Sequence, residues 1–208
     1  MSEAALGAGV RVEDRGPARV LWIARSEVRN AVNAACMRAL ALEGKRARRA
    51  TTVRALVLAG EGTHFAAGAD LREWGPRTSA ESARKLARMG RDTLEALRGA
   101  GVPLIAALEG DALGGGCELA VGCDLRVMSE RARLHWVHGS MAVTTAWGAT
   151  EKLVRLVGPA RATRWLLLGE RVEAAEALAC GLADAVVPAG ACVETACAWA
   201  ERVARVDR

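Results

Sequence analysis

The sequence predicts an α/β protein with a largely parallel sheet. Short apolar segments typical of strands alternate with longer amphipathic segments typical of helices, and the last third of the chain is mostly helical in pattern. Strands separated by helices imply crossover connections between parallel neighbours. The chain has 208 residues and is 51% hydrophobic, which is enough to bury one sizeable core. We therefore expect residues 1–208 to form a single domain.

The first expected elements are a strand, a helix and a second strand. Residues 20–24 are an apolar run that follows the turn signal Gly16-Pro17. Residues 31–49 carry helix-forming residues with apolar spacing near 3.6. A second apolar run, residues 53–59, ends at a glycine and is typical of a strand. These segments predict the first crossover unit.

The middle of the chain repeats this alternation around two glycine-bearing loops. The first loop, residues 60–68, closes the second strand, and a helix over residues 80–97 follows with Ser79 as its N-cap. A third strand over residues 103–108 leads to the second loop, residues 110–116. Because ligands of such sheets bind at the carboxyl ends of the strands, we expect both loops to lie near a binding site.

The remaining expected elements are mostly helices. Residues 117–121 are predicted to form a buried helix, and residues 125–128 and 133–137 to form strands. Four further segments carry helical patterns: residues 149–157, 160–168, 174–179 and 191–206. These helices gather in the C-terminal third of the chain.

The charge of the chain argues against a nucleic-acid partner. The net charge is +5, from 29 basic and 24 acidic residues, and the chain has one Phe and no Tyr to stack on bases. The densest basic cluster, Lys45 to Arg49, has no aromatic residues within it. We interpret this cluster as the solvated end of a helix, where basic residues favour the helix dipole. A patch that binds a ligand with phosphates is the alternative.

The sequence also predicts a cytoplasmic protein that does not enter a membrane. No apolar run approaches the roughly 20 residues that a membrane helix needs, and the N-terminus does not resemble a signal peptide. The six cysteines are scattered without a CxxC pair. We expect them to be reduced and mostly buried.

Two loops carry backbone N–H groups that could face a ligand. Gly114-Gly115-Gly116 stand at a helix start, where the first turn leaves N–H groups without acceptors. The segment Phe65 to Leu71 also follows a strand and opens a short helix. Two converging donors would form an oxyanion hole for a thioester oxygen, whereas the alternative is a close-packed glycine turn. Neither loop carries a dinucleotide or P-loop fingerprint.

Four segments in this order and spacing resemble the enoyl-CoA hydratase/isomerase, or crotonase, superfamily. They are Arg29-Asn30-Ala31, Phe65 to Leu71, Pro103 to Asp124 and Gly181 to Pro188. The resemblance runs from about Val10 to Val206. It implies a crotonase-like spiral of ββα units, an acyl-CoA substrate with coenzyme A as part of the substrate, and no further cofactor or metal. It also implies a homo-oligomer, expected to be a trimer.

Relatives in this superfamily continue with further helices that cover the acyl pocket and form the trimer interface. The resemblance therefore implies a domain that is shortened at its C-terminus. We also expect the last helix, Cys192 to Val206, to present an exposed apolar face that would need a partner.

The resemblance assigns roles to individual residues. Ala69 and Gly115 would give the two oxyanion N–H groups. Six further residues would line the acyl-CoA channel or border its adenine end: Ala67, Asp70, Leu71, Arg72, Asn30 and Ala31. Asp70 alternatively caps the helix that opens at Leu71.

Glu118 and His138 are the expected catalytic side chains. Hydratases of the superfamily use two glutamates, and Glu118 matches the first. The second position, twenty residues further on, falls on His138, which departs from the hydratase pattern. A histidine can donate a hydrogen bond or a proton near neutral pH, where a second carboxylate would repel an acidic substrate. The alternative is a buried structural histidine.

The stretch around His138 is similar to one branch of the superfamily. Trp136 to Met141, followed by Ala146 to Thr150, resembles the ethylmalonyl-CoA and methylmalonyl-CoA decarboxylases. The resemblance implies loss of CO₂ from a malonyl-type thioester, which leaves an enolate for Ala69 and Gly115 to stabilise. Trp147 would either wall the acyl pocket or fill the core.

Two other functions remain open for this sequence. One is an enoyl-CoA hydratase or isomerase that uses Glu118 as its main acid/base. The other is a non-catalytic partner subunit that keeps the crotonase fold.

Overall fold

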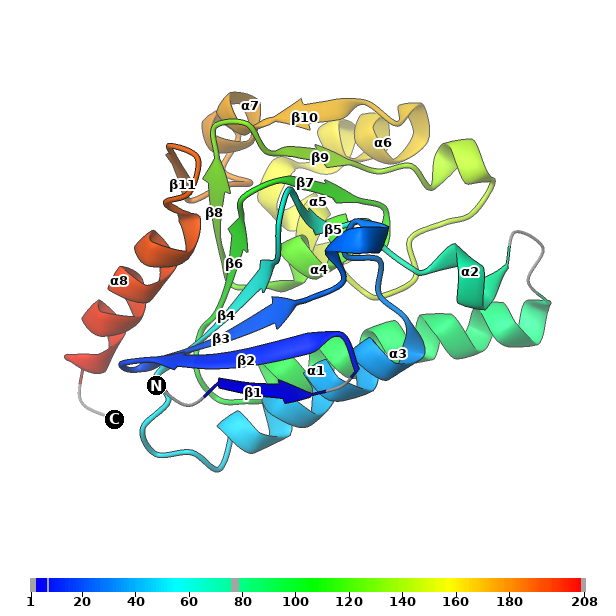
Figure 1. The fold of residues 1–208 in the computed structure, drawn as a ribbon. Coiled ribbons are helices and arrows are strands. Elements are labelled where there is room, and N and C mark those ends of the chain that lie inside the picture. Colours follow the sequence, from blue (N-terminus) through cyan, green and yellow to red (C-terminus); the bar gives the residue numbers. More distant parts are fainter. Residues whose placement is uncertain (1–2, 7, 76–78, 207–208) are drawn as a thin grey trace.

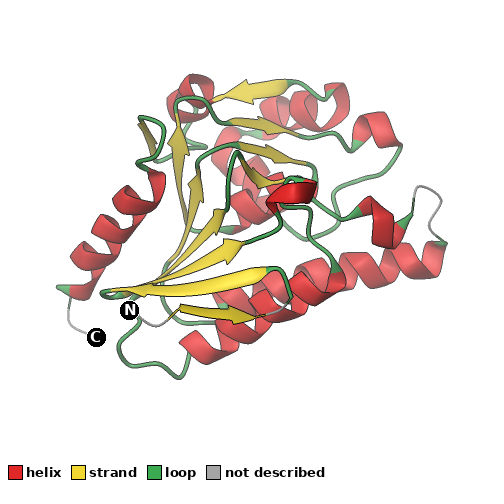
Figure 2. Ribbon diagram, viewed as in Figure 1, coloured by secondary structure: helices red, strands yellow, loops and turns green. Residues whose placement is uncertain are grey.

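The computed structural model describes residues 3–6, 8–75 and 79–206 (Figures 1 and 2). The strands are β1 (Glu3–Leu6), β2 (Val10–Arg15), β3 (Ala18–Ile23), β4 (Ala55–Gly60), β5 (His64–Ala66), β6 (Leu104–Leu108), β7 (Asp111–Leu113), β8 (Leu125–Ser129), β9 (Arg133–His135), β10 (Arg171–Glu173) and β11 (Ala185–Val187). The α-helices are α1 (Ala34–Ala47), α2 (Leu71–Trp74), α3 (Ala80–Arg98), α4 (Gly115–Gly122), α5 (Thr150–Val157), α6 (Pro159–Leu168), α7 (Ala174–Ala179) and α8 (Cys192–Ala204). Two 3₁₀ turns, η1 (Ser26–Val28) and η2 (Gly139–Met141), complete the described elements.

The strands form two sheets. The larger sheet has the order β1-β2-β3-β4-β6-β8-β11, and the smaller has the order β10-β9-β7-β5. From β3 to β11 the neighbours in the larger sheet pair in parallel, whereas β1 and β2 are joined to it by antiparallel pairing. This arrangement confirms the predicted α/β class with a largely parallel sheet.

Helices cover both faces of the larger sheet, so its central strands are apolar throughout. β4 and β6 are buried along their whole length. Alternate residues of β4 enter two different cores: Leu56 and Leu58 pack with residues of α1 and α3, whereas Val57 packs with residues of α8. Figure 1 shows α8 on one side of the sheet and α1 with α3 on the other.

The apolar side of α8 is buried within the chain, so the expected exposed apolar face is wrong. Cys192, Val193, Ala196 and Ala200 pack in the core that α8 shares with the sheet. Both faces of a parallel sheet need a helical cover, and α8 supplies it on this side. The trimer stays a prediction.

Several short strands were not predicted from the sequence. β5 and β7 lie inside the segments expected to be glycine-bearing loops, and β10 lies between two expected helices. These strands have three residues each, which is too short for a period-2 pattern to stand out. The strand expected over residues 133–137 ends at His135. β2 does alternate, with Val10 and Val12 facing inward, and this signal was available.

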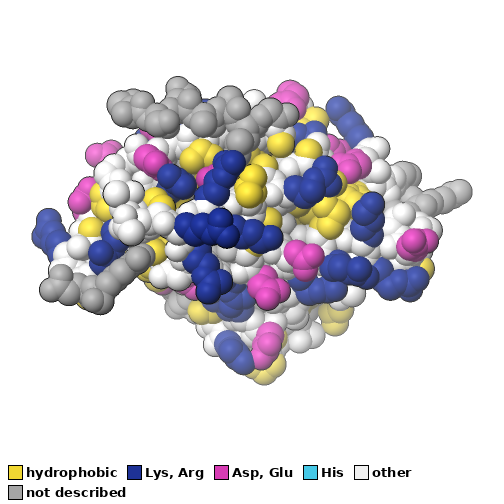
Figure 3. All heavy atoms as spheres, turned by 90° about the horizontal axis from the view of Figure 1, so that it is seen from below, with side chains coloured by type: hydrophobic (Ala, Val, Ile, Leu, Met, Phe, Trp, Pro, Cys, Tyr) yellow, Lys and Arg dark blue, Asp and Glu magenta, His cyan; other side chains and the backbone are white. Residues whose placement is uncertain are grey.

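The basic cluster and the cysteines lie where the sequence placed them. Lys45 and Arg46 occupy the last turn of α1, and Arg46 pairs with Glu43 at 2.6 Å. Basic and acidic side chains are interspersed on the face shown in Figure 3. All six cysteines are free and four are buried, and burial raises the pKa of Cys36 and Cys123 to about 12.

Among the described helices, none combines the length and the apolar character that a membrane crossing requires.

Candidate active site

A pocket of about 410 Å³ lies where the two predicted glycine-bearing loops meet. Its walls come from the β5–α2 loop, α2, α3, the start of α4 and the segment from residue 137 to residue 147. Seven of the predicted site residues line it: Ala67, Ala69, Leu71, Gly115, Glu118, His138 and Trp147. These residues come from different elements between positions 67 and 147, and the fold brings them together in one cavity.

The backbone N–H of Ala69 is directed away from its neighbouring segment. The Val32 N–H donates to the carbonyl of Gly68 at 2.7 Å, and the Asp70 N–H donates to the carbonyl of Val32 at 3.1 Å. This is a parallel bridge in which Val32 faces Ala69 while the residues on either side of Ala69 make the bonds. The N–H of Ala69 therefore points to the opposite side, and Ala69 lines the pocket there.

The second N–H group belongs to Gly115, the first residue of α4. Gly114 precedes it with a positive φ of 50°, a conformation that favours glycine. The carbonyl of Gly114 accepts from the N–H groups of Cys117 and Glu118, which leaves the N–H of Gly115 at the open start of the helix. A Cβ built on Gly68 would lie 2.9 Å from the nitrogen of Gly115, so the two loops are in direct contact.

Glu118 is a buried carboxylate with fixed orientation. Its side chain is 3% exposed, and its two oxygens accept from the backbone N–H groups of Ala146 at 3.1 Å and Trp147 at 2.8 Å. Charge-assisted bonds of this kind hold a carboxylate firmly. The loop after η2 is thereby tied to α4 through Glu118.

His138 stands beside this carboxylate. Its Nε2 lies 3.5 Å from Oε1 of Glu118, and its Nδ1 is buried without a hydrogen-bond partner among the described residues. A structural histidine in a core is ordinarily satisfied by a partner. Two groups that can exchange protons therefore adjoin the two backbone donors, and an unused polar atom remains for a ligand.

Four predicted binding residues do not line the pocket, and Asn30 has a different role from the one predicted. Asn30 has no exposed surface, and its side chain bonds to the backbone N–H of Arg25 and to the carbonyls of Glu61 and His64. A side chain without exposed surface cannot border a bound adenine. Its buried amide instead fixes the turn between β4 and β5.

Asp70, Ala31 and Arg72 also lie outside the lining. Asp70 caps α2 by accepting from the Arg72 N–H at 3.0 Å and pairs with Arg25 at 2.8 Å. The capping interpretation of Asp70 is thus confirmed. The guanidinium of Arg25 also donates to the carbonyl of Ala31, which is buried, whereas Arg72 is exposed on α2. Asp70 and Arg25 therefore brace the loop that carries Ala69.

One wall of the pocket was missed from the sequence. Ala83, Leu86 and Ala87 of α3 line it, and their spacing of three and four residues places them on one face of the helix. That spacing was visible, but it does not tell a pocket wall from a core face. The structure shows that this face of α3 borders the pocket.

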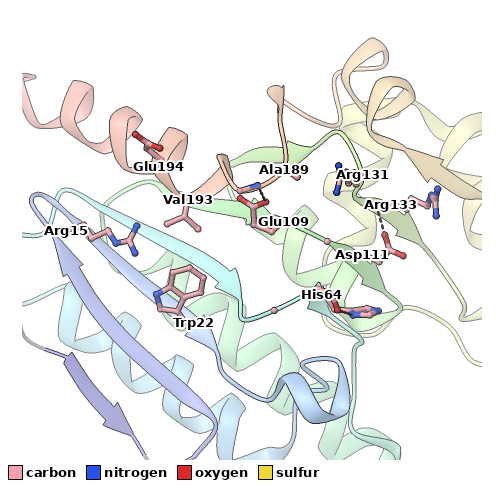
Figure 4. Close-up of a pocket in the computed structure, with 14 residues that line it drawn as sticks. Arg15, Trp22, His64, Glu109, Asp111, Arg131, Arg133, Ala189, Val193 and Glu194 are labelled. Atoms are coloured by element: carbon pink, nitrogen blue, oxygen red, sulfur yellow. Dashed lines mark hydrogen bonds between the residues drawn. The ribbon is translucent and has the colours of Figure 1, made fainter.

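A larger cleft of about 950 Å³ lies elsewhere in the molecule (Figure 4), and none of the predicted catalytic or binding residues lines it. Its charged side chains are largely engaged within the protein. Glu109 accepts from the N–H groups of Gly190 and Cys192, and Arg133 pairs with Glu173 at 2.8 Å. The smaller pocket is lined by Ala69, Gly115 and the buried Glu118, and is therefore the better candidate site.

Comparison with known proteins gives a consistent result. A family model described as enoyl-CoA hydratase/isomerase matches residues 18–208. The short-chain-enoyl-CoA hydratase of Clostridium acetobutylicum is 34% identical over 188 residues, which are 90% of this chain and 72% of that protein. The 2,3-dehydroadipyl-CoA hydratase of Escherichia coli is 36% identical over 186 residues, 89% of this chain and 72% of that protein. The crystal structure of an enoyl-CoA hydratase from Bacillus anthracis has a TM-score of 0.90 at 32% identity and covers 94% of this chain and 76% of its own.

Proposed function

The chain belongs to the enoyl-CoA hydratase/isomerase family, and from that premise we propose that it hydrates or isomerises an enoyl-CoA thioester through an enolate. One observation carries the proposal: the N–H groups of Ala69 and Gly115 meet at a single pocket that also holds the buried carboxylate of Glu118. The relatives named above are hydratases, so they support this chemistry rather than the decarboxylation predicted from the segment around His138.

In the proposed mechanism the thioester oxygen accepts from the N–H groups of Ala69 and Gly115. These donors stabilise the negative charge that develops on this oxygen in the enolate. Interactions that strengthen as this charge develops lower the activation barrier most. In hydration, the hydroxyl of water adds to the β-carbon and a proton adds to the α-carbon. In isomerisation, a proton leaves one carbon and returns to another. Coenzyme A enters only as part of the substrate, and the chemistry needs no other cofactor.

Glu118 transfers the protons in this mechanism, and His138 helps to hold the water. Glu118 is the acid/base because its carboxylate lies in the pocket with its orientation fixed by two N–H donors. His138 lies 3.5 Å from Glu118, and the sequence resemblance aligns it with the second glutamate of hydratases. An imidazole at this position adds no second negative charge beside Glu118, so the repulsion between two adjacent carboxylates is avoided.

Decarboxylation of a methylmalonyl- or ethylmalonyl-CoA is a second candidate, favoured by the free Nδ1 of His138. This buried atom could meet a substrate carboxylate, and many of the lining side chains are apolar. An apolar pocket disfavours an ionised carboxylate in the ground state. The bond to the carboxyl carbon would break, its electron pair would enter the thioester enolate, CO₂ would leave, and the α-carbon would take up a proton.

Variants of His138 distinguish these two reactions. The proposed function predicts that the protein hydrates crotonyl-CoA or isomerises an enoyl-CoA without releasing CO₂ from a malonyl-type thioester. His138→Glu then restores the two-carboxylate arrangement and should retain or raise hydration, since hydration needs the second group only to hold water. The measurement is a parallel assay of hydration, isomerisation and CO₂ release on both proteins.

Other results would replace this proposal. CO₂ release that falls by about 10²-fold in His138→Ala, the scale of general acid catalysis, would assign the decarboxylase instead. A folded protein that binds no acyl-CoA and turns none over would be a non-catalytic partner subunit.

A further inference from the structure

We infer that Trp147 closes the inner end of the acyl pocket and restricts the substrate to short acyl groups of crotonyl size. This inference rests on the proposed function, because it names the acyl group that the same pocket admits.

The lining of the pocket changes from exposed at one end to buried at the other. Leu71, Met141 and Val143 are 50%, 45% and 53% exposed and mark the mouth. Trp147 and Glu118 are 5% and 2% exposed and mark the inner end. A thioester that enters from solvent therefore directs its acyl group toward the indole of Trp147.

The indole lies between two glycines of different helices. A Cβ added to Gly90, in the middle of α3, would lie 2.3 Å from Cγ and Cδ1 of Trp147. A Cβ added to Gly115, at the start of α4, would lie 2.6 Å from Cη2 of the six-membered ring. No side chain other than hydrogen fits at either position while the ring stays in place. The ring is thus fixed in the gap between α3 and α4.

Gly90 makes α3 less stable than alanine would, and the contact with Trp147 explains why a glycine stands there. A glycine in a helix interior is about 1 kcal/mol less favourable than alanine. Gly90 lies ten residues into α3, far from either helix end, and is buried. Its lack of a side chain is what admits the indole of Trp147.

The ring lies close to the carbonyl that the pocket is proposed to bind. It contacts Gly115, whose N–H is one of the two proposed donors to the thioester oxygen. The acyl carbons next to the thioester carbonyl are therefore expected to lie close to the indole. The backbone N–H of Trp147 also donates to Glu118 at 2.8 Å, so the backbone that carries the ring is tied to the carboxylate.

The size of the pocket agrees with a short acyl group. Its volume of about 410 Å³ is near the lower end of the range of roughly 300–1,000 Å³ that small-molecule sites span, and part of it must hold the arm of coenzyme A. Each methylene that does not fit a closed apolar pocket lowers kcat/KM by roughly 10-fold or more. An eight-carbon chain is therefore expected to meet the ring.

The test compares crotonyl-CoA with octenoyl-CoA on the wild type and on Trp147→Leu. The wild type should prefer crotonyl-CoA in kcat/KM by at least about 10²-fold, and Trp147→Leu should reduce that preference by at least about 10-fold by opening the inner end. Trp22→Leu is the matched control, because Trp22 lines the other cleft (Figure 4), and it should keep the wild-type preference. A preference that Trp147→Leu leaves unchanged would overturn the inference.

A measurement on the wild type alone keeps the inference testable if Trp147→Leu does not fold. Calorimetry should show that the unreactive butyryl-CoA binds at least about 10-fold more tightly than octanoyl-CoA. Equal affinities would overturn the inference while leaving the proposed function standing, provided crotonyl-CoA is turned over. A wild type that neither binds nor turns over any acyl-CoA would overturn the proposed function itself.

Discussion

Glu118→Gln is expected to lower kcat for hydration of crotonyl-CoA by about 10³-fold, the middle of the range for loss of a general acid/base. Two effects act together. The amide cannot take up and return a proton as the carboxylate does. It also offers one acceptor oxygen, whereas the N–H groups of Ala146 and Trp147 each donate to a separate oxygen of Glu118. The measurement is the steady-state rate, with binding of butyryl-CoA determined in parallel.

Glu151→Gln is the matched control for this substitution. Glu151 lies in the first turn of α5, where it pairs with Arg155, and both side chains are 76% exposed. Its loss should leave kcat unchanged, because an exposed ion pair contributes little and the residue does not line the pocket. A Glu118→Gln protein that binds butyryl-CoA and retains wild-type kcat would show that Glu118 has a structural role only.

Gly115→Pro is expected to lower kcat by about 10²- to 10³-fold, the scale for loss of one oxyanion donor. Proline lacks the N–H and is compatible with the first position of a helix, which Gly115 occupies in α4. The added side chain would also meet the ring of Trp147, since a Cβ at this position would lie 2.6 Å from it. This second effect must be separated from the loss of the donor.

Gly115→Ala separates the two effects. Alanine introduces the same Cβ against Trp147 and keeps the N–H. The difference in kcat between the alanine and proline variants therefore measures the donor, and proline should be slower by at least about 10-fold. Equal rates for the two variants would mean that the N–H of Gly115 does not face the reacting oxygen.

The strand–helix alternation and the pairing of the two loops could be predicted from the sequence. Long apolar segments such as β4 and β6 have a strong pattern because helices cover both faces of the sheet. Glu118 and His138 could be chosen as catalytic candidates from their spacing along the resembling motif, and the structure places them 3.5 Å apart. The structure places both side chains in the pocket with Ala69 and Gly115, as the resemblance implied.

Other features could not be predicted because they depend on contacts that the sequence does not display. Asn30 lies in a motif that suggests ligand contact, yet its amide is used entirely by three backbone groups. The burial of α8 depends on a sheet face that only the complete fold creates. The choice between hydration and decarboxylation could not be made from one motif, because both proposed reactions use the same pair of N–H donors.

The most direct test of the proposed oxyanion hole measures the stretching frequency of the carbonyl of a bound thioester. Infrared difference spectra of butyryl-CoA with an isotope-labelled carbonyl report how strongly hydrogen-bond donors polarise that bond. An oxyanion hole formed by Ala69 and Gly115 should shift the carbonyl stretch to a lower frequency on the wild type than in water. The shift should persist in Gly115→Ala and be substantially reduced in Gly115→Pro. A bound carbonyl with the same frequency as in water, or an equal shift in Gly115→Pro and the wild type, would contradict the proposed oxyanion hole.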